Sequence, residues 1–182
     1  GPLPTATGTR TVTIAPTPSR TPSPTATIPP GARPTPYLRQ VLHLGAGEQP
    51  TGLALSAAGD RAYVGVVLAG GLGKLRIIRT DPLPLGSLAQ VSLGADKSAP
   101  NGVARVNDAG LVAVANRESA DVAIVNVNTL AVATRIPANL LPDGVIVQGG
   151  LGYVANFGND TVTVFDASDL KVVRSIGVGH EP

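Results

Sequence analysis

Residues 153–182 read YVANFGNDTVTVFDASDLKVVRSIGVGHEP, short apolar runs separated by Gly, Asn and Asp. Runs of this length between turn residues indicate β-strands rather than helices. The stretch also contains Leu170 followed twelve residues later by Pro182. The same interval occurs three more times upstream, without a gap, in LRQVLHLGAGEQP (38–50), LAQVSLGADKSAP (88–100) and LAVATRIPANLLP (130–142).

The repeat continues beyond each Pro. TGLAL, NGVAR and DGVIV follow Pro50, Pro100 and Pro142, and each precedes two further apolar strands and the next Leu. The Pro-to-Pro spacings of 50, 42 and 40 residues are those of a four-stranded propeller blade. The sequence therefore predicts an all-β fold, a β-propeller with three four-stranded blades. Their expected limits are about 51–93, 101–136 and 143–176.

Residues 38–44 align with the outermost strand of a blade whose other three strands are not upstream. We therefore expect one orphan N-terminal outer strand. Three blades make only a partial ring, because closed propellers have about four to eight. An open arc exposes apolar blade faces and an unpaired edge. We expect the chain to be part of a larger propeller, or arcs from separate chains to assemble, and the open blades to self-associate.

Residues 1–36 contain ten Pro and ten Thr and few larger apolar residues. Such a segment cannot bury enough surface to offset its ordering entropy, so the sequence predicts a disordered Thr/Pro-rich linker before a propeller at 37–182. Similar stretches also occur as O-glycosylated stalks, and the linker could be modified or unmodified. This spacer favours an extracellular or cell-surface location for an exported protein.

Composition excludes several classes of protein. The chain has no Cys, which rules out a disulfide framework and a thiolate metal site. From Tyr37 onward, 11 Lys and Arg oppose 12 Asp and Glu, with the signs interspersed. No cluster of positive charge is visible, so no nucleic-acid partner is expected. No apolar run of about 18 residues occurs, so we expect no transmembrane segment in this chain.

The third unit resembles the YVTN-type β-propeller repeat. That repeat has a Tyr-Val-Thr-Asn strand, a polar loop, a Thr-Val-Ser-Val-Ile-Asp strand, a Lys-Val-Val strand and a Gly-rich Pro-x-Gly turn. The second unit, VAVANRESADVAIVNVNTLAVATRI, matches well, whereas the first departs in YVGVV and in its longer loops. The resemblance covers about 37–182 and implies a seven-bladed propeller of surface or secreted type. Surface-layer, receptor-like and redox-associated propellers all carry this repeat, so it does not specify an activity.

The candidate site lies at one end of the expected ring. There, the connections between blades meet the loops between the second and third strands of each blade. Asn, Asp and Gly also satisfy tight turns, so turn formation competes with ligand binding at each position. The candidate ligand-binding residues are Asn101 and Asp143 beside the channel mouth, Asn116, Arg117, Glu118, Asn156, Asn159 and Asp160 on the loops, and His180 and Glu181 in the last connection.

Specific chemistry is not indicated. The two His residues, His43 and His180, fall in different parts of a blade, and no carboxylates have metal-ligand spacing, so neither a metal nor a cofactor is expected. AGGLGK (69–74) lacks the first Gly and the Ser or Thr of a phosphate loop. No GxSxG elbow is present, and no catalytic residue is predicted. Arg105 is either half of a buried ion pair or a channel-facing binding group.

The sequence favours a non-enzymatic propeller that presents its loops to a protein, a polymer or a small ligand. The alternative is an enzyme-associated propeller, a lactonase-like hydrolase or a redox-linked subunit, whose catalytic residues lie in blades outside this chain.

Overall fold

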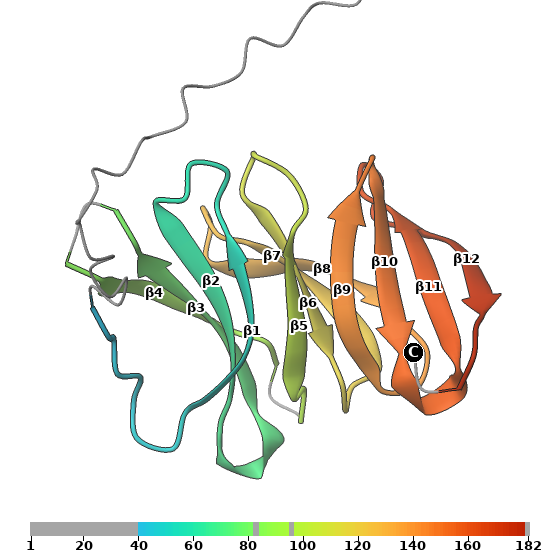
Figure 1. Cartoon of the computed structure of the whole chain (residues 1–182), viewed down its shortest axis with the longest axis horizontal. Coiled ribbons are helices and arrows are strands. Elements are labelled where there is room, and N and C mark those ends of the chain that lie inside the picture. The colour runs from blue at the N-terminus through green and yellow to red at the C-terminus, as the bar shows by residue number, and fades with distance from the viewer. Residues whose placement is uncertain (1–39, 82–83, 95–96, 181–182) are drawn as a thin grey trace, which may run out of the picture. The chain divides into compact units, whose positions relative to one another are not determined.

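The computed structural model describes residues 40–81, 84–94 and 97–180. The expected linker and Glu181 lie outside the described residues. Within them, all regular structure is β apart from two 3₁₀ turns, η1 and η2. Figure 1 shows three sheets side by side, which we call blades 1, 2 and 3. Blade 1 consists of β1 (Gln49–Leu55), β2 (Arg61–Val67), η1 (Ala69–Gly71), β3 (Gly73–Arg79) and β4 (Gly86–Ser92).

Blades 2 and 3 repeat this pattern. Their elements are β5 (Pro100–Arg105), β6 (Leu111–Asn116), β7 (Asp121–Asn126) and β8 (Ala131–Pro137), then β9 (Pro142–Gln148), β10 (Leu151–Asn156), η2 (Phe157–Asn159), β11 (Thr161–Asp166) and β12 (Val172–Gly177). Every sheet is an antiparallel meander in which strands adjacent in the chain pair with each other. The expected all-β fold of three four-stranded blades is confirmed.

The repeat extends to the hydrogen-bond register. In each blade the pairing of the first two strands shifts where a polar residue and a Gly follow the Pro. A shift at this point is a β-bulge, which bends the strand and re-aims its side chains. The three polar-Gly pairs at these shifts are Thr51-Gly52, Asn101-Gly102 and Asp143-Gly144.

Side chains between neighbouring blades form the core. Tyr63, Leu75 and Val114 belong to the buried cluster that joins blades 1 and 2. Ile124 and Phe165 belong to the cluster that joins blades 2 and 3. Because blade 2 is covered on both faces, β6 and β7 are apolar and buried over most of their length. The first strands β1, β5 and β9 contact one another in that order, which places them together along one side of the stack.

The segment before blade 1 differs from the expectation. Residues 40–44 form no strand, which corrects the predicted orphan strand over the part that the structure describes. A strand is stabilised by hydrogen bonds to a neighbouring strand, and the described residues do not include the sheet in which this one would be outermost. Leu42 and Leu44 instead pack against an apolar face of blade 1. This face consists of Ala62, Val64, Val66 and Ile78.

Glu48 forms an ion-pair network on the same face of blade 1. Its carboxylate lies 2.6 Å from Lys74 Nζ and 2.6 Å from Arg76 Nη2, and it also accepts a 3.0 Å hydrogen bond from Arg76 Nε. Only 4% of the Glu48 side chain is exposed. The hydrogen bonds from Arg76 and Lys74 lower the pKa of Glu48 from 4.5 to about 2.

Replacing Glu48 with Gln is expected to lower the free energy of unfolding at pH 7 by about 2 kcal/mol. This expected loss is smaller than the pKa shift alone implies, because Lys74 and Arg76 keep some contact with solvent, which screens their attraction to Glu48. Because the pKa of Glu48 is lower in the folded chain, its stabilising contribution is fully present above pH 4.5 and is lost as the pH falls toward about 2. Urea unfolding of both chains at pH 7 and pH 3 measures this difference.

The matched control is Asp169→Asn, which removes the carboxylate of an exposed pair with Lys171 at 3.6 Å. Its expected cost is at most about 0.5 kcal/mol. Equal losses at Glu48 and Asp169, or a Glu48 effect that does not shrink at low pH, would show that the network does not hold the segment on blade 1.

Candidate functional site

Two sets of loops meet at one end of the stack, as the sequence predicts. The backbone N–H of Arg117 in the β6–β7 loop donates to Ala99 O at 3.0 Å in the connection that leads into blade 2. One blade further on, Phe157 N–H donates to Leu141 O at 3.1 Å. These repeated bonds fasten each connection to the loop of the blade that it enters, and they define what we call the loop end.

The loop end carries three polar side chains and one aromatic ring, which we call the Arg117 cluster: Arg117, Asp143, Asn101 and Phe157. Arg117 Nη1 lies 2.8 Å from Asp143 Oδ1, and Asn101 Nδ2 donates to the same oxygen. The Arg117 guanidinium carbon lies 5.2 Å from the centre of the Phe157 ring, which is a cation–π geometry. Arg117 and Asp143 are each 38% exposed, so the pair is held in place yet accessible to a ligand.

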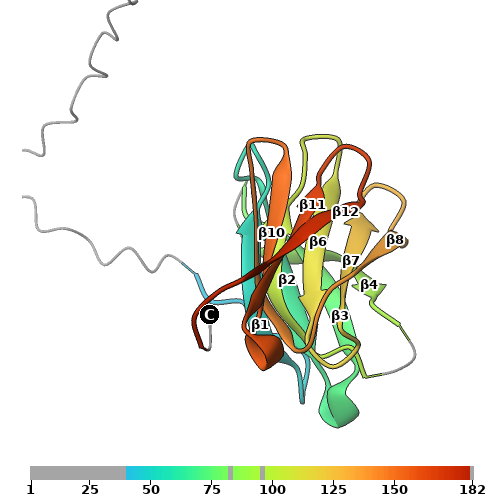
Figure 2. The same ribbon diagram turned by 90° about the vertical axis from the view of Figure 1, so that its right-hand side faces the viewer.

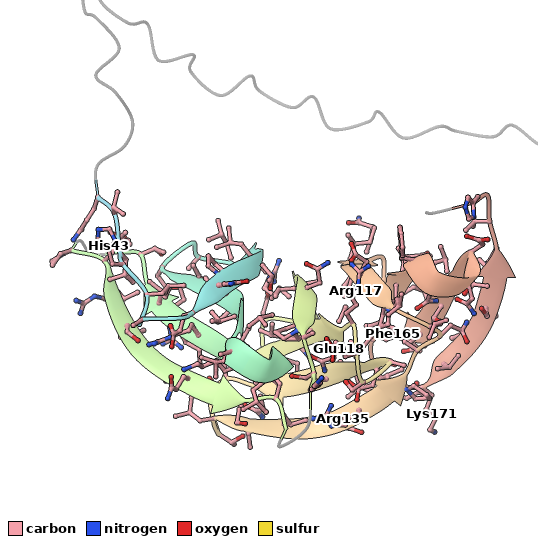
Figure 3. All side chains as sticks on the ribbon, turned by 90° about the horizontal axis from the view of Figure 1, so that it is seen from below. His43, Arg117, Glu118, Arg135, Phe165 and Lys171 are labelled. Atoms are coloured by element: carbon pink, nitrogen blue, oxygen red, sulfur yellow. The ribbon has the colours of Figure 1, made fainter. Side chains whose placement is uncertain are left out.

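Beside this cluster, the first strands line an open concavity of about 540 Å³. Thr51, Asn101 and Asp143 supply its polar edge, and apolar residues such as Val145 and Ile146 supply its wall. The Thr51 hydroxyl donates to Pro100 O at 2.7 Å, so each of the three polar residues is oriented by a neighbour. In Figure 3, Arg117 lies on the concave side of the described blades, whereas Arg135 and Lys171 lie at the convex edge.

Two of the candidate residues, Asn116 and Asn156, are buried and hold structure together. Asn116 Nδ2 donates to Asp121 Oδ1 at 2.7 Å. Asn156 Nδ2 donates to Thr163 Oγ1 at 2.9 Å, and its Oδ1 accepts from the backbone N–H of Asn139 in the connection between blades at 3.3 Å. These hydrogen bonds explain why Asn ends the second strand in both VAVAN and GYVAN. Because both side chains are buried, they do not belong to the Arg117 cluster.

The remaining candidates are spread along the loop end. Glu118 is exposed, and its backbone N–H donates to Ser98 O at 3.3 Å. Asn159 accepts a 3.0 Å hydrogen bond from the Thr161 hydroxyl. Asp160 and His180 lie together, with Asp160 Oδ2 3.3 Å from His180 Nδ1, and form a second, separate polar pair. Glu181 lies outside the described residues.

Sequence reasoning missed two members of this arrangement. Thr51 occupies the same repeat position as Asn101 and Asp143, so the alignment alone could have identified it. The stacking of Phe157 on Arg117 joins loops of two blades, and no local signal in the sequence predicts it. Arg105 does form an ion pair, with Asp108, but its side chain is 40% exposed, so the pair is not buried.

Within residues 40–180, leaving aside the two short gaps, no group of three or more His, Cys, Asp and Glu side chains is arranged to hold a metal ion. The described part of the chain also has no helix long and apolar enough to cross a membrane. Both observations concern only these residues, so the corresponding expectations for the whole chain stay predictions.

No protein-family profile and no curated protein matches the chain. Solved structures do match it. Hydrazine synthase from Kuenenia stuttgartiensis is 20% identical with a TM-score of 0.64, and the match covers 81% of this chain and 41% of that one. A candidate 6-phosphogluconolactonase from Bacteroides uniformis is 18% identical with a TM-score of 0.67, covering 79% and 45%. A Bacteroides caccae protein of unknown function is 13% identical with a TM-score of 0.58, covering 75% and 48%.

These neighbours are β-propeller-like, and at this identity the likeness concerns the fold alone. Together with the three four-stranded sheets, they define the class of this chain, a partial β-propeller. The chain spans less than half the length of each of these three structures.

Proposed function

We propose that the chain belongs to a binding propeller that recognises its ligand through the Arg117 cluster. The observation that supports this most is the accessible Arg117–Asp143 pair, stacked on Phe157 and placed beside a concavity with an apolar wall. Guanidinium N–H groups donate and carboxylate oxygens accept. Both protein donors use Asp143 Oδ1, which leaves the lone pairs of Oδ2 for a donor on the ligand.

The proposed ligand is an extended segment of a protein. The backbone of a peptide offers alternating N–H and C=O groups. Its N–H groups can donate to the Asp143 carboxylate, and its C=O groups can accept from the neighbouring Arg117 guanidinium. Pockets for small molecules enclose most of their ligand, whereas this concavity is open along three first strands. The open shape therefore favours a protein chain over a small molecule.

The finer assignments rest on the sequence. The YVANFGND and VAVANRESAD stretches support membership of the YVTN-type repeat group. The Thr/Pro-rich residues 1–36 support an exported, cell-surface or extracellular protein in which the propeller is held on a spacer. Self-association through open blades is also part of this proposal.

The enzyme-associated alternative has one supporting observation, which is the presence of hydrazine synthase and of a candidate 6-phosphogluconolactonase among structures of the same fold. Fold likeness at this identity transfers no activity. The Arg117 cluster contains no nucleophile paired with a base, so this alternative requires catalytic groups from outside it.

A phage-displayed random-peptide library selected on the immobilised chain tests the proposal. Replacing Arg117 with Ala is expected to lower the affinity of the chain for the enriched peptides at least about 10-fold, because a charged donor on the ligand-facing surface is lost. Binding is measured by biolayer interferometry. The fold itself should be little affected, because the Arg117–Asp143 pair is exposed to solvent.

Arg135→Ala is the matched control. Arg135 is also 38% exposed and pairs with an acid, Asp121, at 2.7 Å, but it lies at the convex edge (Figure 3). Its replacement should leave peptide binding unchanged. Peptides that respond equally to both substitutions, or to neither, would overturn the proposed site.

A further inference from the structure

The outer strands of blade 1 border a second cavity, with a volume of about 270 Å³, which we call the Lys74 pocket. Figure 2 shows β1 to β4 in order across the blade, with β4 at the edge farthest from β1. The pocket therefore lies across the sheet from the concavity beside the Arg117 cluster, and the two share no residue. Its lining consists of Leu68, Leu72, Gly73, Lys74, Gln90, Ser92 and Gly94.

Lys74 gives this pocket an excess of positive charge. Lys74 and Arg76 both pair with one carboxylate, that of Glu48, each at 2.6 Å. In the described part of the chain no other Asp or Glu forms an ion pair with either cation, so two positive charges share one negative charge. Only 15% of the Lys74 side chain and 18% of the Arg76 side chain are exposed. Charges withdrawn from water to this extent are usually matched by opposite ones, and here one negative charge is missing.

In blade 2 the corresponding positions balance each other. By strand register, Lys74 and Gln90 correspond to Asp121 and Arg135. Asp121 and Arg135 form an ion pair at 2.7 Å. In blade 1 the second position is a neutral amide, and Gln90 Oε1 accepts a 3.2 Å hydrogen bond from Lys74 Nζ without adding a negative charge. The one-to-one pairing of charges in blade 2 is therefore not repeated in blade 1.

Blade 3 carries no charge at the same two positions. Thr161 and Ser175 stand there, and Asn139 Nδ2 donates to the hydroxyl oxygen of each at 3.0 Å. Blades 2 and 3 thus satisfy this part of the repeat with their own side chains. In blade 1 the incompletely matched cation borders a cavity, where an anion from outside the chain can reach it.

The rest of the lining indicates which kind of anion fits. Two of the three Lys74 N–H groups bond to Glu48 and Gln90, which leaves one donor for a ligand. The side-chain amide of Gln90 adds N–H donors of its own. A carboxylate accepts from several such donors at once. Leu68 and Leu72 supply an apolar wall beside these donors.

We propose that the Lys74 pocket binds a carboxylate carried on a short apolar chain. Lys74 and Gln90 donate to the carboxylate, which supplies the negative charge that the Glu48 network lacks, and Leu68 and Leu72 contact the apolar chain. The small volume of the pocket suits a ligand of this size. A free organic acid and the carboxyl-terminal residue of a polypeptide share this chemistry, and the experiment distinguishes the two sources. The inference does not depend on the proposed peptide ligand of the Arg117 cluster.

An NMR titration of the isotope-labelled full chain with isovalerate tests the proposal. The backbone amide signals of Gly73 and Gly94, which line the pocket, should shift saturably. Isovaleramide has the same shape without the charge, and acetate has the charge without the apolar chain. Each should bind at least about 10-fold more weakly than isovalerate, because each loses one of the two kinds of contact. Tighter binding of N-acetyl-Gly-Leu than of isovalerate would assign the ligand to the end of a polypeptide, and the reverse order would assign it to a free acid.

Lys74→Gln should lower the affinity for isovalerate at least about 10-fold, because the cation that lines the pocket is lost. Arg76 still pairs with Glu48 in this variant, so the buried carboxylate keeps a partner. Lys171→Gln is the matched control and should leave the affinity unchanged, because Lys171 is 79% exposed and lies outside the lining. Leu72→Trp fills the cavity without changing any charge and should also remove binding, which provides a second variant if Lys74→Gln does not fold.

Three results would overturn the proposal. They are the absence of a saturable shift at Gly73 and Gly94, equal affinities for isovalerate and isovaleramide, and equal effects of the substitutions at Lys74 and Lys171. Shifts confined to residues of the concavity beside the Arg117 cluster would place the carboxylate elsewhere and would equally count against the Lys74 pocket.

Discussion

Replacing Phe165 with Ala is expected to lower the free energy of unfolding by about 3–5 kcal/mol, the usual cost of removing a fully buried aromatic ring. Phe165 has no exposed surface and fills the interface between blades 2 and 3. Its ring lies over Gly152, where an added Cβ would come within 2.0 Å of Cζ. Because Gly152 has no side chain, nothing from that position fills the space that the ring vacates. Urea unfolding at pH 7 gives the value.

Two further substitutions make this expectation specific. Phe157→Ala removes the partly exposed ring at the loop end and should cost only about 1 kcal/mol. Gly152→Ala alone should destabilise the chain through collision with the ring of Phe165, yet be tolerated when Phe165 is already Ala. Strong coupling of this kind is expected only for groups in contact. Additive effects, or a Phe165 loss below about 1 kcal/mol, would mean that blades 2 and 3 do not pack as described.

The repeat made most of the fold predictable. The Leu-to-Pro interval and the polar-Gly pair after each Pro recur, and the structure places four strands in each Pro-to-Pro interval. The segment at 40–44 was predicted wrongly because its similarity to an outer strand, as in LRQVLHL, says nothing about whether a partner strand is present. Strand pairing depends on a neighbouring strand as well as on the segment's own residues, and in the structure Leu42 and Leu44 pack on blade 1 instead.

The site was less predictable than the fold. The alignment indicated the loop end, and the hydrogen bonds of Arg117 and Phe157 to the connections show the expected meeting of the loops. The alignment could not distinguish the buried amide of Asn116 from the partly exposed guanidinium of Arg117, which is its neighbour in the chain. That difference arises from the direction of each side chain at the end of β6, which depends on packing against blade 1 and blade 3.

Gly102→Ala is expected to cost about 3 kcal/mol, because the new methyl group would meet backbone atoms of β9, Asp143 O and Val145 N, both at 2.7 Å. Backbone atoms in a paired strand cannot move aside as a flexible side chain can. Gly144→Ala places the same methyl group at the same repeat position without a neighbour within 4 Å. Its expected effect is within about 0.5 kcal/mol, or slightly stabilising through loss of freedom in the unfolded chain.

The difference in urea unfolding between these two variants tests most directly whether consecutive repeat units stack as propeller blades through their first strands. Both substitutions replace Gly with Ala at the same position of the repeat, so their intrinsic effects on strand propensity are matched. Light scattering should first show that both variants have the same oligomeric state. A loss of about 3 kcal/mol at Gly102 with almost none at Gly144 is the predicted result. Equal losses at the two positions, or no loss at Gly102, would contradict the stacked arrangement of blades 2 and 3.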